Sequence, residues 1–215
     1  MAVAFDAASS AAGAGDVPLT FSHTCSGSDR VLLVWVGVRE GAPPTVTSIT
    51  YNGVNLTRVG GDSNDPLIDL WRLIAPATGA NNVVITLSAN VAVFTGIAIS
   101  FTGAHQTTPL GTAVFEFAGD QSIAVSSATD ELVCDALFVA NDGTATVGAG
   151  QTERINATGG EGLRRCCSTE PGATTVTMSW TGVAETATQG GVSVKPAAEA
   201  GGTTWPGWQS AAGWF

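Results

Sequence analysis

Two histidines and one acidic loop are the parts of this chain whose residue types could support chemistry. His23 lies in "TFSHTCSG" and His105 in "GAHQTTP", and either could join a serine and an aspartate in a catalytic triad. Serine and aspartate are common here, so such a match carries little information. The sequence has no G-x-S-x-G, no H-E-x-x-H and no phosphate-binding loop. We therefore expect structural or solvated histidines, and predict no enzymatic activity, no catalytic residues and no cofactor.

The acidic loop "GGDSNDPLID" contains Asp62, Asn64 and Asp65. Their side-chain oxygens are of the kind that calcium prefers. The same residue types also form ordinary turns, and no complete calcium-binding pattern is present. We expect a turn here, with a calcium site as the weaker alternative and no other metal.

Four cysteines are present, and two of them, Cys166 and Cys167, are adjacent. Neighbours on a strand point to opposite faces, so a bond between these two would be strained. No Cys or His spacing indicates zinc. We predict free thiols, with Cys134 in the core, and leave a Cys25–Cys134 bridge open.

The chain closes on "GGTTWPGWQSAAGWF", which concentrates aromatic residues where chain ends are usually polar. Large aromatic side chains are favoured anchors of protein interfaces. We predict a segment that docks on a partner, formed by Trp205, Pro206, Trp208, Trp214 and Phe215. The alternatives are that this tail covers the protein's own sandwich, or that its tryptophans stack on sugars.

The elements that would carry these residues are β-strands. Apolar residues run continuously or alternate, and Gly, Pro, Asn or Asp bound each run. The Ala-rich "DAASSAAGAG" is expected to be irregular or extended. Helix signals are nearly absent, so the chain is predicted to be all-β. The expected strands are "RVLLVWVGV", "TVTSITYNG", "DLWRLIA", "NNVVITLS", "FTGIAISFTG", "ELVCDALFVA" and "TTVTMSW".

Two halves of the chain resemble each other. The series "LWRL", "GANNVVITLS", "GIAIS" has a later counterpart in "LRRC", "GATTVTMS", "GVSV", which matches Leu70 with Leu163 and Gly79 with Gly172. We predict a jelly-roll-like antiparallel β-sandwich, a double Greek key in which the halves share two facing sheets. It forms one domain over residues 1–196, with halves at about 17–104 and 112–196 joined by "TGAHQTTPLGTAV". Residues 197–215 form a Gly-rich linker and an extended aromatic tail.

The formal net charge is −10, and only 12% of the residues are charged. Nucleic acids attract basic surfaces, so we exclude them as partners. No apolar run is long enough to span a bilayer, and the first residues do not form a signal peptide, so we expect no membrane association and synthesis in a cytoplasm. The basic pair Arg164–Arg165 is expected on a solvated strand edge, with a salt bridge as the alternative.

The segments "VAFDAASSAAGAGDVPLTFSHTCSGSDRVLLVWVGV", "VTSITYNGVNLTRV", "LWRLIAPATGANNVVITLS" and "AISFTGAHQTTPLGT" resemble a group of uncharacterised virion-associated proteins encoded by tailed phages and prophages. The resemblance covers about residues 3–196 and excludes the tail. It implies a virion surface module and brings no catalytic motif with it.

From these observations we expect a structural virion protein, a capsid decoration or cement protein attached through its terminal segments. Its partner would be the major capsid protein or another virion protein, and a homo-oligomer such as a trimer is expected. The first alternative is a receptor- or glycan-binding module of a tail fibre or bacterial surface protein, with or without calcium. A carbohydrate-active enzyme ranks last. Two carboxylates alone would suffice for it, but the expected loops are short, and a catalytic cleft on a sandwich usually needs longer ones.

Overall fold

The computed structural model describes residues 2–13, 17–117, 121–158 and 162–198. Every regular element in these ranges is a β-strand, and the paired strands are antiparallel, which confirms the prediction of an all-β sandwich. The described part of the chain contains no helix of the length and apolar character that crossing a membrane requires.

The strands form four sheets, two from each half of the chain. The first inner sheet has the order β1 (Ala4–Gly13), β9 (Val93–Thr102), β3 (Val31–Arg39), β7 (Leu67–Ile74), β6 (Thr57–Asp62). The first outer sheet has the order β2 (Leu19–Cys25), β8 (Gly79–Leu87), β4 (Val46–Tyr51), β5 (Val54–Asn55).

The second half repeats this plan. The second inner sheet has the order β10 (Val114–Phe117), β17 (Ala187–Val194), β12 (Leu132–Ala140), β15 (Leu163–Pro171), β14 (Thr152–Ala157). The second outer sheet has the order β11 (Ser122–Ser126), β16 (Thr175–Thr181), β13 (Thr146–Val147). Each ladder between named strands joins strands of one half, so each half builds its own pair of sheets instead of sharing two sheets with the other. The prediction that the halves share two facing sheets is therefore not met by the described strands, because each half pairs within itself. The jelly-roll topology and the division into domains stay predictions.

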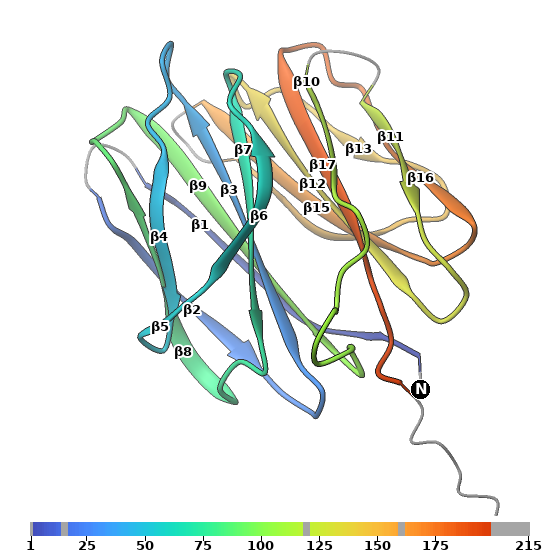
Figure 1. Ribbon diagram of the computed structural model, residues 1–215. Helices are drawn as coiled ribbons and strands as arrows, with labels where there is room; N and C mark the ends of the chain where they lie inside the picture. Colours follow the sequence, from blue (N-terminus) through green and yellow to red (C-terminus); the bar gives the residue numbers. More distant parts are fainter. Residues whose placement is uncertain (1, 14–16, 118–120, 159–161, 199–215) are drawn as a thin grey trace, which may run out of the picture.

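The four sheets lie side by side as layers, with the two inner sheets facing each other (Figure 1). One apolar cluster joins the inner sheets, and includes Trp35 and Phe101 from the first half and Phe138 and Val192 from the second. Further clusters fill the space between each inner sheet and its outer sheet. An inner strand is therefore covered on both faces, and β3 is buried along almost its whole length. The outer strand β16 instead alternates between buried and exposed residues.

The inner sheets interlock through aromatic rings that lie over glycines. A Cβ on Gly37 would lie 2.8 Å from Cε1 of Phe138 on the opposite sheet. In the reciprocal contact, a Cβ on Gly190 would lie 2.8 Å from Cζ3 of Trp35. Both distances are too short for a real side chain, so these glycines are what allow the two sheets to approach.

A shared irregularity aligns the two halves. The ladder of β6 with β7 has a bulge between Arg58 and Gly60, and the ladder of β14 with β15 has one between Glu153 and Ile155. Matching these bulges places Leu70 opposite Gly60 and Cys167 opposite Ile155 at the same point of the two sheets. The sequence comparison paired Leu70 with Leu163, whereas the matched bulges pair Leu70 with Cys167. The comparison is therefore out of register on this strand.

Both ends of the described body lie at one end of the layers (Figure 1). Ala4 on β1 is opposite Thr102, and the amide of Ala197 donates to the carbonyl oxygen of Gly103 at 2.7 Å. The amide of Val3 donates to the carbonyl oxygen of Asp130 at 3.0 Å. We call this the proximal end. The β6–β7 hairpin lies at the distal end, because Leu67 pairs with Val38 at the far end of β3.

Candidate functional site

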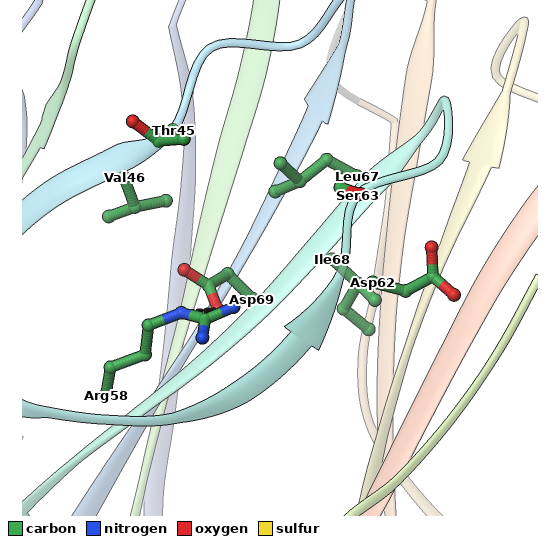
Figure 2. Close-up of a pocket in the computed structure, with 8 residues that line it drawn as sticks. All are labelled: Thr45, Val46, Arg58, Asp62, Ser63, Leu67, Ile68 and Asp69. Carbon is green, nitrogen blue, oxygen red and sulfur yellow. Dashed lines mark hydrogen bonds and ion pairs between the residues drawn. The ribbon is translucent and has the colours of Figure 1, made fainter.

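A small pocket opens at the distal end, between the first inner and the first outer sheet. It has a volume of about 130 Å³. We call it the distal pocket, and Figure 2 shows its lining by Thr45, Val46, Arg58, Asp62, Ser63, Leu67, Ile68 and Asp69. The β6–β7 hairpin supplies most of these residues, and the segment leading into β4 supplies the other wall.

The pairing of β6 with β7 places an arginine and an aspartate together at this pocket. Arg58 lies opposite Trp71, and Gly61 lies opposite Asp69. Asp69 and Trp71 are two residues apart on β7 and so share a face. A Cβ on Gly61 would lie 2.7 Å from Oδ1 of Asp69, so the carboxyl group occupies space that a larger residue would take.

Asp69 is held by two donors. Nε of Arg58 donates to Oδ1 at 2.8 Å, and Nε1 of Trp71 donates to Oδ2 at 2.9 Å. Burial raises the pKa of the Asp69 carboxyl, and the bond from Trp71 and the charge of Arg58 partly offset this effect. The Arg58 side chain is 55% exposed and that of Asp69 only 6% exposed, so the guanidinium forms the open side of the pair. This arrangement offers hydrogen bonds to a ligand.

The loop predicted as a turn or a calcium site borders this pocket. Oδ1 of Asp62 accepts a bond from the amide of Asn64 at 2.8 Å, and Oδ1 of Asp65 accepts one from the amide of Glu40 at 3.2 Å. In Figure 2 the carboxylate of Asp62 points away from the Arg58–Asp69 pair. Within the described ranges, no three His, Cys, Asp or Glu side chains gather as metal ligands would. These two carboxylates thus accept hydrogen bonds from backbone amides of the protein. Calcium binding stays a prediction.

The predicted docking residues Trp205, Pro206, Trp208, Trp214 and Phe215 lie outside the described residues. Whether this tail docks on a partner or covers the sandwich therefore stays a prediction.

Sequence reasoning missed a buried carboxylate in the second half. Asp135 on β12 is fully buried between the second inner and the second outer sheet. Its Oδ1 accepts bonds from the amide and hydroxyl of Ser168 at 3.0 and 2.6 Å. Its Oδ2 accepts bonds from Nε1 of Trp180 at 2.7 Å and Nε2 of Gln189 at 2.9 Å. Burial raises the pKa of Asp135 to about 6, against the lowering effect of these donors. The signal was present, since "ELVCDALFVA" places an aspartate inside an apolar run.

The two histidines have structural contacts. Nδ1 of His23 lies 2.8 Å from Oγ of Ser9, and burial lowers the pKa of this imidazole to about 4. Asp6 lies nearby, but its carboxylate accepts bonds from Ser26 and Ser100. Nδ1 of His105 accepts bonds from the amides of Thr107 and Thr108, in the segment that joins the halves.

All four cysteines are buried and free, as predicted, and Cys134 lies in the core. Its Sγ is 3.9 Å from that of Cys167. The expected solvated edge at Arg164–Arg165 is wrong, because β15 lies between β12 and β14. Nε of Arg165 donates to Oγ of Ser10 in the first half at 2.8 Å.

Comparisons with known proteins supply no identity for this chain. No family model, no curated protein and no solved structure matches it. The resemblance to virion-associated phage proteins therefore stays a prediction.

Proposed function

We propose that the protein is a non-enzymatic structural protein of a phage virion, most simply a capsid decoration or head-surface protein. It attaches to the major capsid protein or to another virion protein through its terminal segments, and its body extends from the particle.

The position of the two ends of the body carries this proposal. Val3 and Ala197 are both tied to the proximal end, by bonds to the carbonyl oxygens of Asp130 and Gly103. The residues before Val3 and after Ala198 are therefore attached to the body at the same end. A partner that binds either segment then meets the proximal end, and the distal loops and the distal pocket face outward.

The packing of the body is consistent with a display role. The inner sheets interlock through Trp35 and Phe138. The two halves are also joined at the proximal end by a β-bridge between Ala104 and Pro196. Interlocked cores of this kind transmit strain and resist deformation. A rigid body attached at one end presents its opposite end to the surroundings.

Co-sedimentation with phage particles or empty capsids tests the proposal. The full chain is expected to bind saturably, at a fixed ratio to the major capsid protein, and a chain ending at Ala198 is expected to lose binding while staying folded. This truncation keeps the bond from Ala197 to Gly103, so the body retains its proximal contacts.

A full-length variant with Trp205, Trp208, Trp214 and Phe215 changed to Ala is the matched control, because it removes the aromatic rings of the tail and keeps the length of the chain. Binding that survives both changes would place attachment elsewhere. Absence of binding by the full chain to any head preparation would overturn the decoration role. A truncated chain that unfolds would instead favour a tail that covers its own sandwich.

A further inference from the structure

We propose that the distal pocket binds one neutral sugar residue, through the Arg58–Asp69 pair. This inference stands apart from the proposed virion role, since it concerns the isolated protein and a different end of the body.

The fold does not require this pocket, because the second half closes the matching position. The shared bulge places Glu153 where the first half has Arg58, and Asn156 where it has Gly61. Nδ2 of Asn156 donates to Oε2 of Glu153 at 2.8 Å and to the carbonyl oxygen of Ala145 at 3.0 Å. The second half therefore has a bonded asparagine side chain at the strand position where the first half has Gly61 against the carboxyl group of Asp69.

A second contact strengthens the closure in the second half. Nη1 of Arg164 donates to Oδ1 of Asn156 at 2.7 Å, and Sγ of Cys166 lies 3.5 Å from the same oxygen. Cys166 stands at the position of Asp69, since it is opposite Asn156 as Asp69 is opposite Gly61. One plan of strands thus gives a filled site in one half and an open site with an ion pair in the other.

The size of the pocket limits the ligand to a single small unit. A volume of about 130 Å³ is well below the roughly 300–1,000 Å³ of pockets that hold drug-sized molecules. One sugar ring, free or at the end of a chain, is a unit of this scale.

The chemistry of the lining favours a neutral ligand with hydroxyl groups. Arg58 is bonded through Nε, and its two terminal amino groups have no partner among the described residues. The charges of Arg58 and Asp69 cancel, and the neighbouring Asp62 adds a negative charge, so an anion gains little here. Adjacent hydroxyls of a sugar can accept from the guanidinium and donate to a carboxylate oxygen.

The remaining lining suits the carbon face of a ring. Val46 and Leu67 supply apolar surface, and Thr45 stands on the opposite wall with its hydroxyl (Figure 2). Sites for small ligands commonly combine an apolar lining with a few polar groups that fix the orientation.

Titration by two-dimensional NMR tests this inference, with neutral monosaccharides and trisaccharides as probes. The reporters are the indole N–H signal of Trp71 and the Nε–H signal of Arg58, because both groups donate to Asp69. The indole signal of Trp180, which donates to Asp135 and borders a different pocket in the second half, is the comparison signal. At least one neutral sugar is expected to shift the first two signals saturably and leave the third in place.

Two variants separate binding at this pair from other effects. Arg58→Gln removes the guanidinium and is expected to abolish the shift of the Trp71 signal. Arg72→Gln is the matched control, since Arg72 is on the same strand as Asp69 but on its other face, and should leave the shift intact. The inference is overturned if no neutral sugar moves the Trp71 and Arg58 signals, if only acidic sugars do so, or if R58Q binds as well as the unaltered protein.

Discussion

The two halves of the molecule each bury a tryptophan–aspartate pair between an inner and an outer sheet, and they satisfy the carboxylate differently. Asp69 receives one indole bond and one bond from an exposed arginine, beside a pocket. Asp135 receives four bonds from uncharged donors and has no exposed surface. A carboxylate in a sandwich can thus be stabilised either by a cation at an opening or by a closed set of dipoles. Only the first arrangement leaves groups available to a ligand.

The largest expected effect comes from removing the closed carboxylate. Asp135→Ala leaves the donors of Ser168, Trp180 and Gln189 buried without an acceptor, so it should lower the free energy of unfolding by roughly 3–5 kcal/mol. Asp69→Ala should cost less, roughly 1–2 kcal/mol, because water can reach the exposed Arg58. Urea denaturation of both variants measures the difference. Equal losses would show that the two pairs are not energetically distinct.

The free energy of unfolding should depend on pH because of the buried carboxyl group of Asp135. The carboxyl of Asp135 titrates at about 6 in the folded protein, against the ordinary value of 3.8. Between these values the unfolded chain loses a proton that the folded chain keeps. The contribution of Asp135 to the free energy of unfolding should therefore be largest below about pH 4 and fall by roughly 3 kcal/mol as the pH rises through about 6. The buried His23, with its pKa lowered to about 4, contributes in the opposite direction over the same range, so the Asp135 contribution is measured as the difference between the unaltered protein and Asp135→Asn.

Urea denaturation across this pH range measures the slope. Asp135→Asn should remove the loss of stability that accompanies rising pH and leave the opposite contribution of His23. Asp69→Ala should change the slope less. A loss of stability with rising pH that persists in Asp135→Asn would assign the titration to another group.

A smaller effect on stability is expected from a change in the Arg58–Asp69 pair. Arg58→Gln removes a charge that lowers the pKa of Asp69, so this pKa should rise further from its already raised value. The free energy of unfolding should change by less than about 1 kcal/mol, because Arg58 is largely exposed. Carbon-detected NMR of the Asp69 carboxyl follows the titration, with Arg72→Gln as the control. An unchanged pKa in R58Q would mean that the ion pair does not hold this carboxylate.

The sequence was most informative where the period of apolar residues is strong. The runs "RVLLVWVGV" and "NNVVITLS" predicted strands that the structure contains as β3 and β8. The continuous apolar run of β3 also indicated a strand that is buried on both faces. A strand of a two-layer sandwich exposes one face, whereas β3 is covered on both, and only layers on each side of its sheet can provide that.

The site could not be predicted from the sequence, for a physical reason. The acidic loop pointed to the right hairpin, yet the pair that lines the pocket is Arg58 with Asp69, which depends on a strand register shifted by a bulge. Likewise, Asp135 stood out in its apolar run, but its partners Trp180 and Gln189 come from two other strands. A single sequence carries no register between strands, so neither set of contacts could be assembled from it.

Hydrogen exchange of the two indole N–H groups tests the contrast between the halves most directly. Both groups donate to an aspartate, Trp180 in the closed pair and Trp71 in the open one. Trp180 is expected to exchange only when the whole protein unfolds, with a protection that matches the global free energy of unfolding. Trp71 is expected to exchange faster, through local opening of the distal pocket. Equal protection of both groups, or slower exchange at Trp71, would contradict the contrast between the fully buried carboxylate of Asp135 and the carboxylate of Asp69 that borders the distal pocket.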